Sequence, residues 1–157
     1  MIGAASIGAF YHGFEPATQT YRGLLELGEF LQSFGTGFTY EIENCPIEDA
    51  AINGHYDVAL TSPPYYDTEL YSTEPTQSYI RYRSFGDWCA GFYIPMAQIG
   101  ADHADTFVIN VGTRQYPMTD VLRQAGLVVT RTHERLSGKA GLGRQPDGAE
   151  AFFVVSR

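Results

Sequence analysis

The stretch from Asp57 to Tyr66 constrains the fold of this chain more than any other. It reads Asp-Val-Ala-Leu-Thr-Ser-Pro-Pro-Tyr-Tyr, an apolar run that leads directly into two consecutive prolines. The apolar run predicts a buried β-strand, and the Ser62–Tyr65 segment, here named the proline corner, predicts that the strand stops abruptly. Each proline fixes its own φ angle and lacks an N–H, so the carbonyl groups of Ser62 and Pro63 stay available as acceptors in a stiff turn.

The composition predicts one folded domain that spans residues 1–157. Hydrophobic residues make up 44% of the chain and aromatic residues 14%, which is enough for a packed core. The net charge of −8 is uneven, because residues 1–76 hold eleven acids and a single basic residue, Arg22. An acidic chain binds nucleic acid poorly without a local basic surface, so we expect any DNA contact in the second half.

Neither a disulfide framework nor a membrane segment is expected. Cys45 and Cys89 share no metal-ligand spacing, and we interpret them as free thiols in a reducing cytoplasm. The apolar residues 1–14 lack the basic flank and cleavage site of a signal peptide, and no stretch approaches the ~18 apolar residues of a membrane span. These features favour a cytoplasmic protein.

The pattern of elements predicts an α/β fold. Residues 1–8 resemble the tail of a helix, and residues 67–84 an irregular loop. In the helix predicted at 85–101, Pro95 is expected to cause a kink or an early end, and Trp88, Phe92 and Met96 are expected to lie in the core. The last two strands follow one another without a helix between them, which indicates an antiparallel hairpin on a mostly parallel sheet. We expect strands at 9–15, 38–43, 56–61, 106–111, 127–132 and 149–156, and helices at 17–34, 85–101 and 116–124.

Polar side chains follow the first two of these strands. Glu15 ends the first strand before Pro16, and the run Asn44–Asp49 forms a polar corner after the second. An acid at such a strand end is the residue with which nucleoside-binding α/β folds grip ribose hydroxyls, although a solvated strand end is the commoner reading of Glu15 alone.

The run Tyr56–Asp67 closely resembles the catalytic motif of S-adenosylmethionine-dependent amino-methyltransferases that modify DNA at adenine N6 or cytosine N4. The order of its neighbours is similar too: the acid Glu15, the corner at 46–49, the strand ending Asn110-Val111-Gly112 and the terminal hairpin. The resemblance covers nearly the whole chain. It implies a Rossmann-like class I methyltransferase fold, S-adenosylmethionine as cofactor, DNA as partner and no metal.

The resemblance also assigns roles within the proline corner, Ser62, Pro63, Pro64 and Tyr65. An exocyclic base amine is a weak nucleophile, and the Ser62 side chain with the Pro63 carbonyl would accept hydrogen bonds from its two protons. Tyr65 would stack on the flipped-out base. Serine at the first motif position is similar to the cytosine-N4 subset, so we favour cytosine N4 over adenine N6.

Binding residues follow from the same resemblance. Glu15 would bind the ribose hydroxyls, and Ile47 and Glu48 would flank and hydrogen-bond the adenine, with Asp49 as a competitor for the second role. Residues that would contact DNA are basic or aromatic, and a solvated loop is the alternative for the basic set. They are Tyr66, Arg131, Arg135, Lys139 and Arg144.

The sequence departs from the family at the cofactor's methionine end. The family has a Gly-rich turn after its first strand, and neither Gly3, Gly8 nor Gly13 follows a predicted strand with the right spacing. That strand lies between the second and fourth strands, so its loss would leave two unpaired ladders. We therefore expect an N-terminally incomplete domain: a fragment, which we favour, or a chain whose central slot is filled by a second polypeptide or by another segment.

Two other classes of function stay open. One is a non-catalytic remnant of the fold that binds nucleic acid or protein, against which the intact Ser62 and Tyr65 argue. The other is methylation of an RNA base or a protein amide, where asparagine usually takes the place of Ser62.

Overall fold

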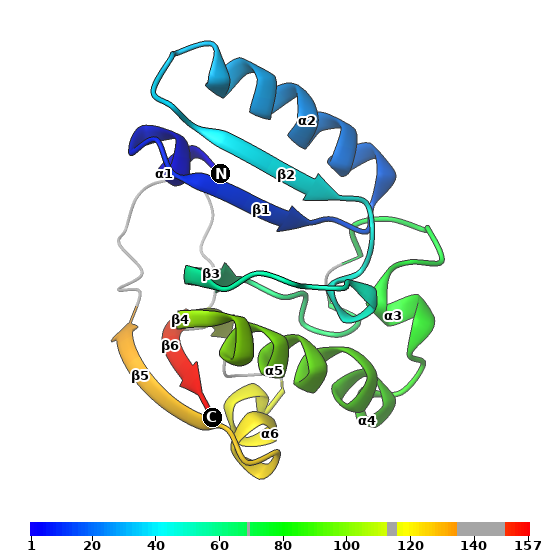
Figure 1. Ribbon diagram of the computed structural model, residues 1–157. Helices are drawn as coiled ribbons and strands as arrows, with labels where there is room; N and C mark the ends of the chain where they lie inside the picture. The colour runs from blue at the N-terminus through cyan, green and yellow to red at the C-terminus, as the bar shows by residue number, and fades with distance from the viewer. Residues whose placement is uncertain (69, 113–115, 135–149) are drawn as a thin grey trace, which may run out of the picture. The chain divides into compact units, whose positions relative to one another are not determined.

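The computed structural model describes residues 1–68, 70–112, 116–134 and 150–157. The chain divides into two compact units, and each is described by itself. The first unit comprises residues 1–51 and 71–81, and the second comprises residues 52–70 and 82–157. Figure 1 draws both units, coloured from blue at the N-terminus to red at the C-terminus.

The first unit is a pair of parallel strands with helices. Strand β1 pairs with β2 in register, from Phe10 opposite Thr39 to Phe14 opposite Glu43. Both strands run toward the same edge, so their carboxyl ends are neighbours. The elements are α1 (Ile2–Ser6), β1 (Phe10–Phe14), α2 (Thr18–Gln32), β2 (Thr39–Glu43), a 3₁₀ turn (Ile47–Asp49) and α3 (Ser78–Arg81).

Helix α2 packs closely on β2 because it carries a glycine at the contact. A Cβ atom added to Gly28 would lie 2.3 Å from the Tyr40 ring. The Tyr40 hydroxyl donates to the carbonyl of Leu25 at 3.2 Å, which fixes the helix over the strand. The predicted helical stripe extended to Phe34, but α2 ends at Gln32 and Phe34 is exposed. The chain turns away at Gly35, which has a φ of +67° that favours glycine.

The second unit is a mixed four-stranded sheet with the order β3-β4-β6-β5. Strands β3 and β4 are parallel, whereas β6 is antiparallel to both β4 and β5. The elements are β3 (Tyr56–Thr61), α4 (Phe85–Trp88), a π-helix (Cys89–Tyr93), α5 (Ile94–His103), β4 (Ala104–Gly112), α6 (Met118–Gln124), β5 (Val128–Glu134) and β6 (Glu150–Ser156).

The helical segment from Phe85 to His103 contains a π-helical turn just before Pro95. The Ile94 N–H bonds to the carbonyl of Cys89, five residues earlier. A proline ring clashes with the carbonyl four residues before it, here that of Gly91, and a wider turn relieves this clash. Pro95 therefore changes the local winding, and the helix continues for another eight residues after it.

The core of the second unit lies between the sheet and its helices. Trp88, Phe92 and Met96 are buried, which confirms their predicted place in the core. A Cβ atom on Gly100 of α5 would lie 2.7 Å from the Phe107 ring, so α5 lies directly on β4. The buried strand residues are Phe107, Ile109, Val111, Ala151, Phe153 and Val155.

The predicted α/β class and the antiparallel terminal pair are confirmed. Two expectations need correction. The described strands form two separate open sheets, and the larger one is mixed and not mostly parallel. The run before the proline corner is also not a buried strand, because Val58 and Leu60 are 62% and 69% exposed on an edge strand. No helix among the described residues has the length and apolar character needed to cross a membrane.

Candidate functional site

The proline corner follows β3 directly, at the carboxyl end of a parallel strand. The last strand residue, Thr61, pairs with Ile109 of β4, and the chain leaves the sheet at Ser62. Ser62 is exposed, Pro63 is buried, and Pro64 and Tyr65 are half-buried. The corner thus exposes the Ser62 side chain to solvent, while the next residue, Pro63, is packed into the protein.

The turn after the corner is fixed by local hydrogen bonds. The Thr68 N–H and hydroxyl both donate to the carbonyl of Tyr65, at 3.1 and 2.7 Å. Tyr66 has a φ of +53° and is the one non-glycine residue with a positive φ in the described part of the chain. This conformation is strained for a bulky side chain, and strained backbone concentrates at functional sites.

An aromatic cluster of Tyr66, Phe85, Trp88 and Tyr116 holds this strained residue. The Tyr66 ring lies 5.9 to 6.0 Å from the centroids of the other three rings. Phe85 and Tyr116 stack on each other with centroids 4.5 Å apart. Aromatic pairs at these distances stabilise beyond their buried area, so the cluster offsets the cost of the turn.

Two hydrogen bonds tie the aromatic cluster to the chain around the corner. The Tyr66 hydroxyl donates to the carbonyl of Arg83 at 2.8 Å, and the Tyr116 hydroxyl donates to Asp67 Oδ1 at 2.8 Å. Tyr66, which we predicted to contact nucleic acid, is therefore an anchor of the proline corner in this structure. The resulting site is a stiff acceptor at a strand end.

The predicted basic contacts to DNA lie mostly beyond what the structure describes. Arg131 belongs to strand β5. Arg135, Lys139 and Arg144 lie outside the described residues.

Tyr93 is a residue near the corner that the sequence analysis missed. It is fully buried in the π-helix, and its hydroxyl has no hydrogen-bond partner among the described residues. Burial raises the pKa of Tyr93, and the nearby Cys89 and Tyr65 raise it further. Pro95 was the available signal, because it causes the turn that carries Tyr93.

In the first unit, Glu15 lies at the end of β1 as predicted. Its Oε1 accepts a hydrogen bond from the Ala17 N–H at 2.8 Å, and its carbonyl accepts one from Asn44 Nδ2 at 2.8 Å. Partial burial raises the pKa of the Glu15 carboxyl, and the charge of Glu74 raises it too, while the bond from Ala17 acts in the opposite direction. Glu15 is thus a fixed carboxylate with an energetic cost of ionisation.

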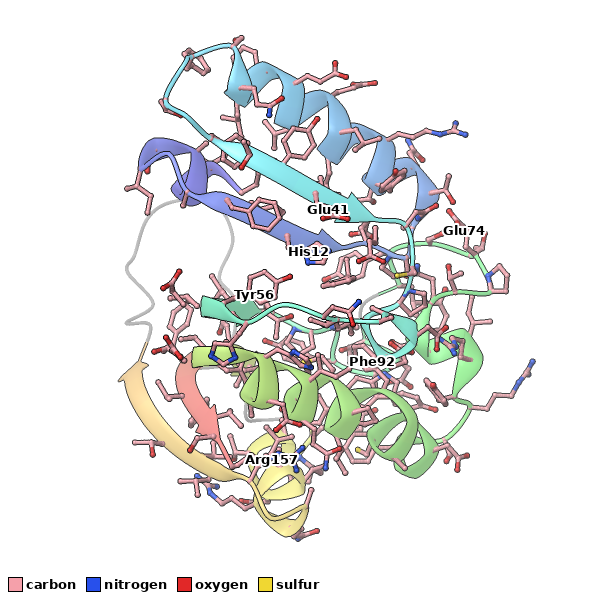
Figure 2. All side chains as sticks on the ribbon, in the orientation of Figure 1. His12, Glu41, Tyr56, Glu74, Phe92 and Arg157 are labelled. Carbon is pink, nitrogen blue, oxygen red and sulfur yellow. The ribbon has the colours of Figure 1, made fainter. Side chains whose placement is uncertain are left out.

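Glu74, which no sequence motif indicated, caps helix α2 from a distant loop. Its carboxylate accepts from the Thr18 N–H at 3.0 Å and from the Thr18 hydroxyl at 2.7 Å. A carboxylate at a helix N-terminus satisfies free N–H groups and the helix dipole. Next to it runs an open groove of about 660 Å³ lined by Thr18, Gln19, Arg22, Gly23, Glu26 and Glu74; Figure 2 labels Glu74.

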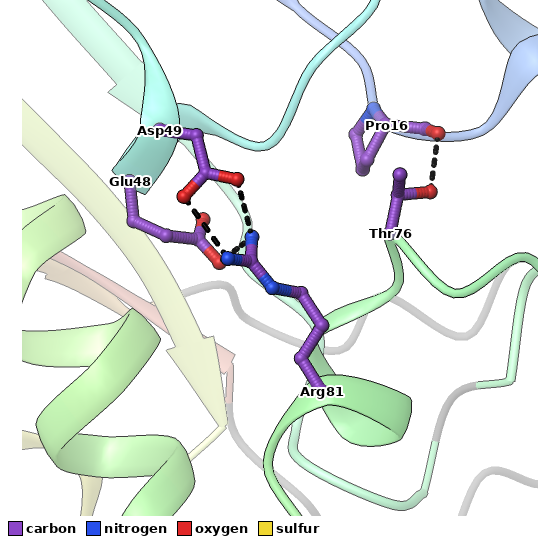
Figure 3. A network of polar contacts seen from close by, with 5 residues as sticks. All are labelled: Pro16, Glu48, Asp49, Thr76 and Arg81. Carbon is purple, nitrogen blue, oxygen red and sulfur yellow. Dashed lines mark hydrogen bonds and ion pairs between the residues drawn. The ribbon is translucent and has the colours of Figure 1, made fainter.

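Ile47, Glu48 and Asp49 form the 3₁₀ turn after β2, and Arg81 from α3 binds its two acids (Figure 3). Arg81 donates to Glu48 Oε1 at 2.9 Å and to Asp49 Oδ1 at 3.0 Å. The Glu48 side chain is 4% exposed, whereas that of Asp49 is 50% exposed. The ion pair thus engages the predicted adenine ligand Glu48 and leaves Asp49 half open to solvent.

One more hydrogen bond joins the segment 71–81, which contains Glu74 and Arg81, to the chain just after β1. The Thr76 hydroxyl donates to the carbonyl of Pro16 at 2.8 Å (Figure 3). Glu15 and the turn 47–49 therefore meet at one edge of a parallel pair, as predicted for nucleoside binding, and residues 71–81 line that edge. The proline corner belongs to the other unit.

One group of potential metal ligands occurs among the described residues. It consists of His12, Glu41 and Glu43, whose ligand atoms lie within 4.8 Å of one another; Figure 2 labels His12 and Glu41 on their two strands. His12 Nε2 already lies 2.9 Å from Glu43 Oε1. We interpret the group as a cross-strand histidine–carboxylate pair with a neighbouring acid.

No family model matches this chain, and no match was found among curated proteins or solved structures.

Proposed function

We propose that this chain carries the catalytic part of an S-adenosylmethionine-dependent methyltransferase that acts on an exocyclic amine of a DNA base, cytosine N4 in preference to adenine N6. The observation that carries the proposal is the proline corner: an exposed serine, a buried proline and a half-buried tyrosine at the carboxyl end of a parallel strand. In open α/β sheets, ligands bind at this end of the strands.

The chemistry requires two fixed acceptors beside a flat surface. Ser62 and the Pro63 carbonyl accept hydrogen bonds from the two amine protons, which favours a tetrahedral nitrogen with an available lone pair. Tyr65 stacks on the base after it leaves the duplex. When bound, S-adenosylmethionine supplies an electrophilic methyl group. The rigid corner limits reorganisation, so the residues act mainly by positioning the amine.

The edge of the first unit fits the nucleoside part of the cofactor. Glu15 is the acceptor for the ribose hydroxyls, and Ile47 provides an apolar contact for the adenine. Arg81 binds both acids, but the Glu48 side chain is almost wholly buried whereas that of Asp49 is half exposed, so we assign the adenine amine to Asp49. In the Rossmann-like fold that we propose, β1 corresponds to the second strand of the family and β3 to the fourth.

The function is tested by transfer of a labelled methyl group to cytosine-containing DNA. Because no Gly-rich turn follows β1, β2 or β3, the chain is assayed alone and with a fused strand and Gly-rich turn taken from a family member. We expect transfer with the fusion, and a loss of about 10²–10³-fold with Ser62→Ala, the range known for one lost polar contact to a transition state.

Matched variants separate chemistry from folding. Ser156→Ala removes another exposed serine at a strand end of the same unit, and Phe34→Ala removes an exposed aromatic ring of the first unit that lies after α2. Both should leave transfer unchanged, whereas Tyr65→Ala should abolish it. Full activity of Ser62→Ala or Tyr65→Ala would contradict the proposal. If RNA or a glutamine peptide is labelled and DNA is not, the proline corner would be catalytic but its substrate would belong to another class.

A further inference from the structure

One face of the β1–β2 pair carries a histidine and two glutamates. His12 of β1 lies opposite Glu41 of β2 in the parallel register, and Glu43 follows two residues later on β2 (Figure 2). Side chains at paired positions share a face, and alternate residues of a strand return to it. Because the Tyr40 hydroxyl bonds to α2, these three side chains lie on the opposite face of the pair.

The donor atoms of the three side chains converge. His12 Nε2 lies 2.9 Å from Glu43 Oε1, and each of the three residues offers a ligand atom within 4.8 Å of the other two. A four-coordinate zinc ion with ligand distances of about 2.0–2.1 Å brings its donors to roughly 3.3 Å from one another. Glu41 is exposed and the Glu43 side chain is 37% exposed, so small rotations of these side chains suffice to surround an ion.

The histidine of this group is held in a fixed position. Its side chain is 11% exposed. The rings of Phe10 and Phe14 flank it along β1, with centroids 6.3 and 4.5 Å from that of His12. A ligand that is already fixed loses little freedom when an ion binds, which favours binding.

The charge of the first unit also favours a cation. The unit holds eight acidic residues and two arginines, Arg22 and Arg81. Arg81 binds the two acids of the 3₁₀ turn, and Arg22 lines the groove beside α2. His12 can balance one of the two glutamate charges, and only when it is protonated. Carboxylates this close repel each other, and a divalent cation removes the repulsion.

We propose that His12, Glu41 and Glu43 bind one zinc ion across β1 and β2. The cross-strand pair of His12 and Glu43 then supplies two of its ligands. An imidazole nitrogen with two carboxylates suits zinc, whereas Mg²⁺ and Ca²⁺ are bound through oxygen. Three protein ligands leave one position for water, and the ion stabilises the first unit because it joins its two strands. The inference is independent of the proposed methyltransferase function.

The test is a calorimetric titration of the full chain with zinc chloride. We expect one zinc ion per chain, with a dissociation constant in the micromolar range that a large excess of Mg²⁺ does not change. The melting temperature should rise with zinc and stay constant with magnesium. Of the four histidines in the chain, His12 should be the one whose ring nitrogen signals shift in NMR spectra.

Substitution of the ligands should remove the site. His12→Asn should weaken zinc binding by about 100-fold or more, because even a group that only orients a ligand contributes about 10–100-fold. Glu41→Gln should weaken it by about tenfold or more. Glu41 is exposed, so this second variant tests the site without disturbing the fold, and it decides the result if His12→Asn does not fold.

Two matched variants serve as controls. His55 Nε2 lies 2.8 Å from Asp105 Oδ1 in an exposed pair that belongs to no group of three ligands in the described part of the chain. His55→Asn should therefore leave zinc binding unchanged. Cys45 Sγ lies 3.9 Å from Glu43 Oε2 but outside the group of three, so Cys45→Ser should also bind zinc like the unaltered chain.

Four results would overturn the inference. The first is no binding at millimolar zinc, and the second is equal binding by the folded Glu41→Gln protein. The third is equal affinity for Mg²⁺, which would mean that the glutamates attract cations without a defined site. The fourth is loss of binding in Cys45→Ser, which would place the ion on the thiol.

Discussion

The two units stabilise their strand ends by different means. Around the proline corner, rings and prolines hold the chain: Tyr66 lies among Phe85, Trp88 and Tyr116, and Pro63 is buried. At the edge of the first unit, charged groups hold it, with Arg81 between two acids and Glu74 on the first turn of α2.

This difference suggests a division of labour. Packed rings carry no charge near neutral pH and respond little to salt, which would suit the proposed site, where an amine has to be held in one geometry. Carboxylates depend on pH and on their partners, and they suit the recognition of hydroxyl and amino groups on a nucleoside. Substitutions should therefore destabilise the second unit through lost packing and the first unit through lost or unpaired charges.

The largest effect is expected in the aromatic cluster. Trp88→Ala should lower the free energy of unfolding of the second unit by about 3–5 kcal/mol, because the side chain is fully buried and leaves a large cavity. Urea denaturation followed by circular dichroism measures this loss. Phe30→Ala, which removes an exposed ring of α2, is the control and should change stability by no more than about 0.5 kcal/mol. A loss below 1 kcal/mol for Trp88→Ala would contradict a packed corner.

The next effect concerns the ion pair of the first unit. Arg81→Met should cost about 3 kcal/mol, at the low end for a broken buried pair, because Glu48 is buried while Arg81 is partly exposed. Adding Glu48→Gln to Arg81→Met should recover much of the loss in the same denaturation experiment. Asp49→Asn alone should cost no more than about 1 kcal/mol, since its carboxylate is half exposed. Equal losses for Glu48→Gln and Asp49→Asn would remove the distinction between these two acids.

A smaller effect of opposite sign is expected for Tyr93→Phe. Removal of a buried hydroxyl that has no partner among the described residues should raise stability by about 1 kcal/mol. The same variant is informative in the methyl-transfer assay, where reduced transfer by a more stable protein would show that the hydroxyl serves the corner. A destabilised Tyr93→Phe would mean that the hydroxyl has a structural partner.

The smallest effect is the pH dependence at Glu15. Its pKa is raised in the folded chain, so its contribution to stability is fully present below the unfolded pKa near ~4.3 and is lost as the pH rises through the folded value. Glu15→Gln should therefore raise the melting temperature slightly at pH 7 and have no effect below about pH 4. The same variant should weaken cofactor binding by the fused protein. A lower melting temperature at pH 7 would show that the charged form is stabilised.

The sequence predicted the local elements well because their signals are local. Helix α2 ends within two residues of its predicted end, β3 has the predicted bounds, and Trp88, Phe92 and Met96 lie in the core. Each of these follows from apolar spacing or from the backbone limits of glycine and proline.

Long-range partners could not be predicted in the same way. Arg81 binds acids that precede it by 32 and 33 residues, and Glu74 caps a helix 56 residues before it. No spacing in the sequence predicts either contact, because both depend on the path that residues 71–81 take in the folded chain. The burial of β3 was also overestimated, since an apolar strand reads the same whether it has one neighbour or two.

The most direct test of the central claim is the identity of the methylated nucleoside. DNA treated with S-adenosylmethionine and the fused chain is digested to nucleosides and analysed by mass spectrometry, with Ser62→Ala beside it. The account predicts N4-methylcytosine that disappears in Ser62→Ala. Absence of any methylated nucleoside, methylation of a ring carbon, or an exocyclic product that persists without the Ser62 hydroxyl would contradict it.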